Sequence, residues 1–183
     1  NDYGGSEMVQ QLFFSVEETV SQLEGTLTMI EWIAARVPEP WHHRTPEGAV
    51  RGLKGDERTV AFHLSHLTLY ETKLAIPVLD DLSKGGDGRG AVPSAHVSWF
   101  RPDVDQLSLA PVSDILAQLR SARVQHVEIV RRFNDEAFNR PATSLWGTGD
   151  GQKLESAGWV AVKTVQHTGE HANSLFRFAL FAP

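Results

Sequence analysis

Apolar residues recur at alternating steps of four and three along the first part of the chain. This spacing is typical of one face of an amphipathic helix. Ser6 is a suitable N-cap, and Pro38 with Pro40 is expected to end the helix. The pattern predicts a long first helix whose buried face comprises Val9, Phe13, Val16, Val20, Leu23, Leu27, Ile30, Ala34 and Val37.

Three further segments show the same periodicity. The second helix is expected to begin near Asp56; Glu71 interrupts its apolar stripe, and Pro77 should bend or end it. A third helix is expected to begin after Ser113 as its N-cap, and a fourth covers residues 155–181. The inner face of the third helix is predicted to comprise Ile115, Leu119, Ala122, Val127, Val130 and Phe133.

The segments between these helices are predicted to be loops. Trp41–Gly55 and Asn134–Lys153 contain proline and several glycines, and Lys84–Pro111 is the longest irregular stretch. A long connection between the second and third helices is expected if these two helices run parallel. Four amphipathic helices without a convincing strand pair predict an all-α protein, a four-helix bundle with long crossover connections, as a single domain over residues 1–183.

Charge and composition narrow the classes of function. The chain has 17 Lys and Arg against 23 Asp and Glu, a net charge of −6, and no dense basic block, so we expect no nucleic-acid partner. The absence of cysteine excludes disulfides, iron–sulfur clusters and a cysteine nucleophile, so that nitrogen and oxygen must bind any metal. With no long apolar run and no signal pattern in the first residues, we expect no membrane partner and a cytoplasmic location.

Eight histidines are the compositional excess, and two pairs of them lie on predicted helices. His167 and His171, four residues apart, project side by side from the apolar face of the fourth helix. Either His63 or His66, three residues apart on the second helix, can complete a site with three nitrogen ligands, which is typical of a catalytic metal. Core histidines bonded to carbonyl groups are the alternative interpretation. The remaining histidines are interpreted as loop or packing residues: His42, His43, His96 and His126.

Two short motifs lie on these helices: His66-Leu67 followed by Glu71, and the run Val165–His171. They resemble the two signatures of the DinB/YfiT-like superfamily of metal-binding four-helix bundles. The segment Phe62–His66 is also similar to the DinB-type domain of ergothioneine-synthesising sulfoxide synthases. The resemblance implies a divalent metal ion, zinc or nickel, or iron in the sulfoxide-synthase branch. It implies that the ligands are His66, His167 and His171, with His63 as the alternative first ligand.

The resemblance also implies a function. Characterised relatives include transferases and isomerases that act with low-molecular-weight thiols, so it implies a metal-dependent enzyme, a thiol S-transferase or a hydrolase, with the S-transferase preferred. Because the chain has no cysteine, the thiol would arrive as a cosubstrate. A non-catalytic metal-binding or stress-associated protein of the same fold is the alternative.

Several other side chains are candidates for supporting roles. Glu71 is predicted to accept a hydrogen bond from a ligand histidine or to act as a general base, or else to reach solvent at the edge of the stripe. Tyr70 either lines the metal cavity or packs in the core. Arg44 and Arg51 either contact an anionic thiol or are surface residues. The aromatic residues of the long loops are expected to form a homodimer contact or a lid over the cavity: Trp99, Phe100 and Trp146.

Overall fold

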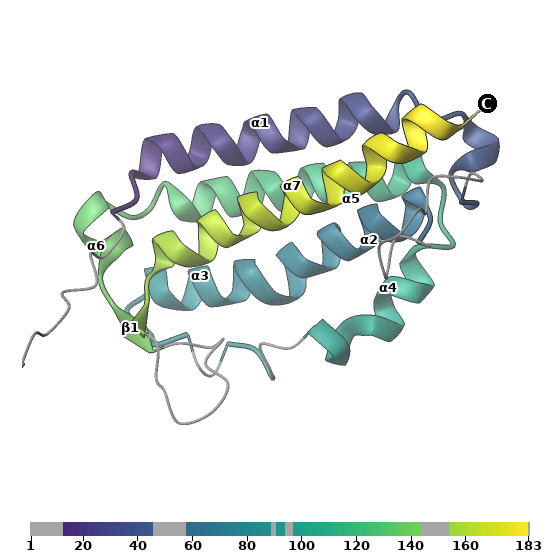
Figure 1. Cartoon of the computed structure of the whole chain (residues 1–183). Helices are drawn as coiled ribbons and strands as arrows, with labels where there is room; N and C mark the ends of the chain where they lie inside the picture. The colour runs from purple at the N-terminus through teal and green to yellow at the C-terminus, as the bar shows by residue number, and fades with distance from the viewer. Residues whose placement is uncertain (1–12, 46–57, 89–90, 94–96, 144–153, 183) are drawn as a thin grey trace, which may run out of the picture.

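The computed structural model describes residues 13–45, 58–88, 91–93, 97–143 and 154–182. Its long helical elements lie side by side and form a four-helix bundle, which confirms the predicted fold class (Figure 1). They are α1 (Val16–Ala34), the continuous segment α2 (Val60–Tyr70), η2 (Glu71–Ala75) and α3 (Ile76–Ser83), then α5 (Val112–Val130) and α7 (Ala157–Phe181).

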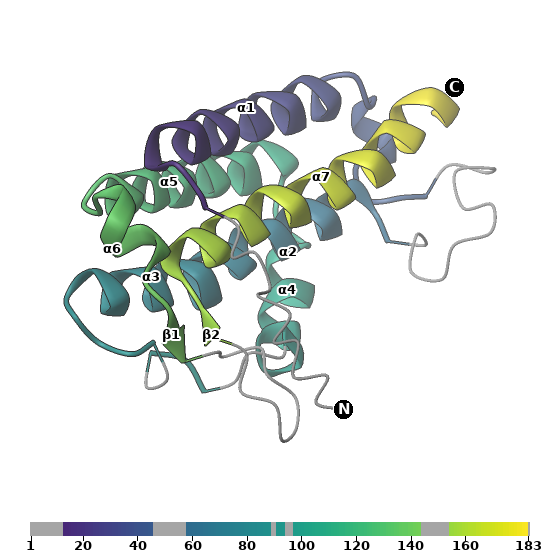
Figure 2. The ribbon, with the colours of Figure 1, turned by 60° about the vertical axis from the view of Figure 1, so that its left-hand side comes forward.

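The direction of these helices explains the long connection after α3. The α2–α3 segment and α5 run in the same direction, while α1 and α7 run in the opposite one (Figure 1). The chain must therefore return along the bundle between Ser83 and Val112, as the crossover prediction requires. In Figure 2 the helix α4 (Arg101–Leu107), which belongs to this connection, lies below α2 and outside the bundle.

Side-chain caps set the start of three of the long helices. Ser15 caps α1, Thr59 caps α2 and Ser156 caps α7, each accepting a hydrogen bond from a backbone N–H of the first turn. The predicted Ser113 cap is wrong, because α5 begins at Val112, directly after Pro111. Proline fixes its own φ angle, and no side chain caps this helix.

Two of the predicted helix starts cannot be compared with the structure. The expected first turns of the first helix, from Ser6, and the expected start of the second helix at Asp56 lie outside the described residues. Phe13 was expected on the buried face of the first helix, but it precedes α1 and is exposed.

The predicted loops contain short ordered elements. Pro102 lies in the first turn of α4, and the side chain of Asn134 caps α6 (Asp135–Asn139) by accepting from the N–H of Ala137. Elements of two to seven residues are too short to show a hydrophobic period, so the sequence pattern does not reveal them. The remaining ones are the 3₁₀ turns η1 (Glu39–Trp41) and η3 (Val97–Phe100) and the antiparallel pair β1 (Ala142–Thr143) and β2 (Leu154–Glu155).

Pro77 neither ends nor breaks the helix in which it lies. The preceding segment η2 is a π turn, in which the N–H of Ile76 donates to the carbonyl of Glu71, five residues earlier. Proline has no N–H to donate and its ring crowds the carbonyl four residues before it. The wide turn accommodates both effects, so the helix continues to Ser83.

Two apolar clusters fill the bundle, one in each half. Val160, at the start of α7, belongs to the first cluster, and Phe178, near its end, belongs to the second. His167 and His171 lie between them on α7, and His66 lies on α2, which contributes residues to both clusters. The structure confirms that the predicted inner face of α5 is buried, apart from Phe133, which is half-buried.

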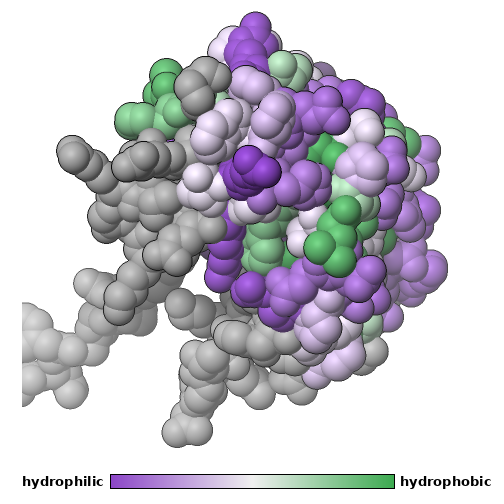
Figure 3. Space-filling view, turned by 90° about the vertical axis from the view of Figure 1, so that its right-hand side faces the viewer, coloured by the Kyte–Doolittle hydropathy of each residue, from purple (hydrophilic) through white to green (hydrophobic). Residues whose placement is uncertain are grey.

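At the end that carries the C-terminus, hydrophilic side chains cover most of the described surface and apolar ones are scattered among them (Figure 3). None of the helices in the described ranges combines the length and the apolar composition needed to cross a lipid bilayer.

Candidate metal centre

Three imidazoles converge between the two apolar clusters. Nε2 of His167 lies 3.2 Å from Nε2 of His66 and 3.2 Å from Nε2 of His171. An ion about 2.1 Å from two nitrogens would separate them by about 3.0–3.4 Å in octahedral or tetrahedral geometry. These two spacings therefore match those of ligands around one ion. The candidate ligand atoms of all three residues lie within 4.8 Å of one another, so the three residues could hold a metal. We call His66, His167 and His171 the histidine triad.

All three imidazoles are neutral near pH 7. Burial lowers the pKa of His66 to about 4, with further lowering by the charges of Arg58 and Arg101. Burial, followed by the neighbouring His66 and Lys163, lowers the pKa of His167 to about 3, and burial also holds the pKa of His171 well below its usual value. Neutral imidazole is the form that binds a metal, so no proton has to be displaced.

The contacts within the triad fit a cation. Two facing imidazole nitrogens form a hydrogen bond only if one of them carries a proton. Nε2 of His167 carries either one proton or one lone pair, so it cannot form a well-aligned hydrogen bond with both of the nitrogens that it faces. A cation that accepts all three lone pairs resolves this arrangement.

His63 contacts the triad from outside. Its Nδ1 lies 2.8 Å from Nδ1 of His171. When Nε2 of His171 faces the metal position, Nδ1 carries the proton and donates to His63. Such an outer hydrogen bond fixes the tautomer and the ring orientation of a ligand. The structure therefore places His66 in the triad and His63 behind His171.

Replacing His63 by leucine should weaken metal binding about 10- to 100-fold while one ion per chain is still bound at saturation. Replacing His66 by leucine should instead remove the site. Competition with a coloured chelator measures both affinities for zinc. His63→Gln, which keeps a hydrogen-bonding group, should recover part of the affinity. The reverse ranking, with His63→Leu abolishing binding, would show that His63 is the ligand.

Tyr70 lies one turn after His66 and packs against the triad. It is buried, and its ring centroid is 4.2 Å from that of His167. Phe62 stacks on His66 with centroids 6.2 Å apart and planes 14° apart, and Phe100 lies 6.2 Å from the same imidazole. These aromatic rings keep water away from one side of the triad.

Glu71 forms a buried ion pair. Its Oε1 accepts from Nη2 and Nε of Arg123 at 2.6 and 3.0 Å, and its Oε2 is 3.1 Å from Nδ1 of His126. The carboxylate is 0% exposed, so the interpretation that it reaches solvent is wrong. Burial by itself raises the pKa of Glu71, but the hydrogen bond from His126 and the charge of Arg123 outweigh it and hold the pKa below its usual value.

Arg123 connects this ion pair to the triad and to α1. It donates to Oγ1 of Thr168, next to His167, at 3.1 Å, and to the carbonyl of Leu23 and Oγ1 of Thr26 on α1. We call Glu71, Arg123, His126 and Thr168 the buried polar cluster. Arg123 was not among the residues predicted for the site, and His126 was interpreted as a loop or packing residue. A signal was present, because both residues fall within the apolar stripe of α5.

The predicted contact of Arg44 and Arg51 with an anionic thiol stays a prediction. Arg44 is exposed, and Arg51 lies outside the described residues. Two other arginines lower the pKa of His66 through their charges. They are Arg58, just before α2, and Arg101, at the start of α4.

The loop aromatics also differ from expectation. Phe100 is fully buried rather than exposed, and it packs edge-on against the half-buried Trp99. Trp146 lies outside the described residues. Phe100 therefore belongs to the wall beside His66 rather than to an exposed contact.

Acid should destabilise the metal-free protein through the triad. Because the pKa of His66 is about 4 in the folded chain and about 6.5 when unfolded, the unfolded chain binds more protons below pH 6.5. The free energy of unfolding should fall as the pH drops from about 6.5 to about 4, by up to about 1.4 kcal/mol per pH unit for this residue. Urea unfolding at several pH values measures the slope. His66→Gln should reduce it, and an unchanged slope would contradict the assignment.

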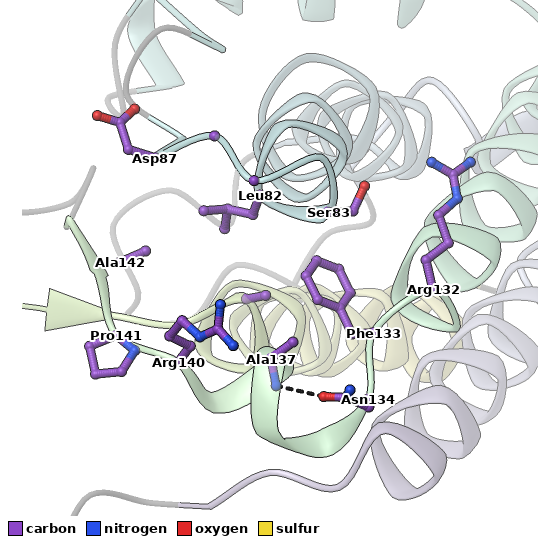
Figure 4. Close-up of a pocket in the computed structure, with 13 residues that line it drawn as sticks. Leu82, Ser83, Asp87, Arg132, Phe133, Asn134, Ala137, Arg140, Pro141 and Ala142 are labelled. Carbon is purple, nitrogen blue, oxygen red and sulfur yellow. Dashed lines mark hydrogen bonds between the residues drawn. The ribbon is translucent and has the colours of Figure 1, made fainter.

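A separate cleft lies at the end of the bundle where α3 ends. Its volume is about 510 Å³, and it lies between the end of α3 and the segment that leads from α5 through α6 to β1 (Figure 4). Arg140 and Phe133 line it, together with the loop that follows Leu82. None of its lining residues belongs to the triad, so the triad is not part of this cleft.

Two solved structures share this fold. A protein from Streptococcus pneumoniae superposes with a TM-score of 0.68 at 14% sequence identity, over 94% of each chain. The colibactin self-resistance protein ClbS, crystallised in complex with double-stranded DNA, superposes with a TM-score of 0.61 at 16% identity, over 88% of this chain and 93% of ClbS. No curated protein sequence matches the chain.

The ClbS structure corrects one expectation from the sequence. We expected no nucleic-acid partner because the net charge is −6, but a protein of the same fold has been crystallised with double-stranded DNA. Net charge averages over the whole surface, whereas a nucleic-acid interface needs only a local group of cations. The charge argument therefore does not exclude this class of partner.

A family comparison agrees with the fold and with the triad. The sequence profile of the DinB superfamily matches residues 22–175. The matched range includes the three histidines of the triad and all four long helical elements of the bundle, α1 and α7 in part. The chain therefore belongs to the DinB superfamily.

Proposed function

We propose that the protein is a metal-dependent thiol S-transferase whose histidine triad holds a divalent cation, zinc or nickel. The observation that carries this proposal is the convergence of three neutral imidazoles, in which Nε2 of His167 lies 3.2 Å from Nε2 of each of the other two. Three neutral ligands leave the charge of the ion uncompensated. An ion held in this way lowers the pKa of a bound water or thiol and so provides a nucleophile at neutral pH.

The surrounding residues support such a reaction in distinct ways. His63 orients the imidazole of His171 through the Nδ1 contact. Phe62 and Phe100 exclude water beside His66, which strengthens electrostatic interactions at the site. Arg58 and Arg101 add positive charge near His66, which favours an anionic nucleophile over its protonated form.

The proposed reaction transfers the sulfur of a small thiol to an electrophilic carbon. The thiol loses its proton to solvent, its sulfur forms a bond to the carbon of the acceptor, and the bond from that carbon to its leaving group breaks with the electron pair. Because the chain contains no cysteine, the sulfur comes from the cosubstrate.

The test is metal analysis followed by a thiol-transfer assay. Protein without a polyhistidine tag, purified without chelator, should contain one ion per chain. It should accelerate the reaction of small thiols with 1-chloro-2,4-dinitrobenzene, and the acceleration should disappear on removal of the metal and return on its addition. His43→Ala, which changes an exposed histidine, is the matched control and should keep full activity. One tightly held ion without thiol-dependent turnover across a panel of acceptors would instead support the non-catalytic metal-binding alternative.

A further inference from the structure

Two arginines that are distant in the sequence lie over the same aromatic ring beside the triad. The guanidinium carbons of Arg58 and Arg101 each lie 4.7 Å from the ring centroid of Phe62. Phe62 in turn stacks on His66. A guanidinium held over an aromatic face keeps the N–H donors at its edge available for a ligand. The two cations are thus fixed by the same ring that packs against a predicted metal ligand.

The positive charge of this pair is only partly compensated. Nε of Arg101 pairs with Oδ1 of Asp105 at 3.0 Å. Among the described residues, no carboxylate forms an ion pair with Arg58. Burial and the neighbouring Arg101 lower the pKa of Arg58, and the charge of Asp105 offsets only part of this lowering. Two like charges held together favour the binding of an anion between them.

We propose that Arg58 and Arg101 form an anion subsite. It binds the carboxylate of a small thiol while the sulfur of the same thiol lies beside the metal position of the triad. This inference rests on the proposed function and deepens it by naming the substrate class, a carboxylate-bearing thiol. The planar donors of guanidinium match the two oxygens of a carboxylate. Both arginines lie over the ring that stacks on His66, and their charges lower the pKa of His66, so the subsite lies beside the triad.

Three thiols that share one carbon chain and differ in end charge test this proposal. They are 3-mercaptopropionate, 2-mercaptoethanol and cysteamine, with an anionic, a neutral and a cationic end. Their binding to the cobalt-substituted protein is measured by the charge-transfer absorption between sulfur and cobalt. The anionic thiol should bind about tenfold more tightly than the neutral one, as expected for a charged hydrogen bond. The cationic thiol should bind most weakly.

Substitution of the arginines should remove this preference. Arg58→Met and Arg101→Met should each weaken binding of 3-mercaptopropionate about tenfold and weaken binding of 2-mercaptoethanol much less, because only the first thiol carries a carboxylate. Arg131→Met, at an exposed ion pair with Glu24, is the matched control and should change neither. Arg58→Lys keeps the charge but loses the planar donors, so intermediate affinity is expected. Cobalt content and circular dichroism establish that each variant is folded.

A second measurement does not require the metal. Calorimetric titration of the metal-free protein with propionate should show weak binding that Arg58→Met abolishes. Inorganic phosphate competing better than propionate would overturn the choice of carboxylate. Thiols that bind cobalt without any preference for charge would overturn the subsite and leave the proposed function intact. Absence of any thiol-dependent absorption would instead contradict the proposed function.

Discussion

Replacing Arg123 by alanine should lower the free energy of unfolding by about 3–5 kcal/mol, the range expected when one partner of a buried ion pair is removed. The substitution leaves the carboxylate of Glu71 buried without its guanidinium partner, and it removes the bonds to Leu23, Thr26 and Thr168. Urea unfolding followed by circular dichroism measures the change. The effect should be large because α1, η2, α5 and α7 all meet at this side chain.

Two further variants separate the ion pair from general damage to α5. Arg131→Ala, on the residue that follows the same helix, removes only an exposed pair with Glu24 and should change the stability by less than about 0.5 kcal/mol. The double variant Glu71→Met with Arg123→Met replaces both charges by apolar groups and should recover much of the loss. A loss below about 1 kcal/mol for Arg123→Ala would show that the ion pair does not hold the helices together.

Replacing His167 by alanine should abolish metal binding, because the Nε2 atom of this imidazole lies 3.2 Å from Nε2 of both other members of the triad. At a free zinc concentration of about 100 times the dissociation constant, the wild-type protein should gain about 2.7 kcal/mol of stability. The variant should gain none. Elemental analysis gives the metal content, and thermal unfolding with and without zinc gives the stabilisation.

The control for this experiment is again His43→Ala, which changes an exposed histidine outside the triad. It should retain both the ion and the stabilisation. If His167→Ala still bound one ion per chain and gained the same stability, the metal would lie elsewhere. Glu71 would not be a ready substitute ligand, because Arg123 and His126 already occupy its carboxylate.

The bundle could be predicted from the sequence because its long helices bury one face over many turns. A period of four and three is visible when it repeats, as along α1 and α7. The five residues of α6 and the two-residue strands offer no such repetition. The π turn could not be predicted from the sequence pattern either. It adds one residue to a turn, while the helix keeps its direction on both sides.

The site could be predicted only as far as it depends on one helix. His167 and His171 share a face because residues four apart on a helix always do. His63 and His66 differ by about 60° around α2, and only the packing of α2 against α7 determines which of them meets the pair. Arg101 comes near His66 through the path of the long connection, which no local pattern encodes.

The buried ion pair could have been predicted in part from the sequence. Glu71 and Arg123 each interrupt an apolar stripe, on different helices, with opposite charges. Burying either alone would be strongly unfavourable, so the two interruptions are informative only when they are considered together. A search for complementary charges within apolar stripes would have found this pair from the sequence.

The π turn of η2 also constrains how this helix can vary in length. Such a turn holds one residue more than an α-helical turn, so deleting a residue there would restore a regular helix. All of α3 would then rotate by about 100° relative to α2. Val78 and Leu79, both in the core, would turn toward solvent while His66 stayed in place. Insertions and deletions should therefore be tolerated in the loops of this protein but not between Glu71 and Pro77. Substitutions are a different matter, because the exposed Thr72 within that interval should accept many different side chains.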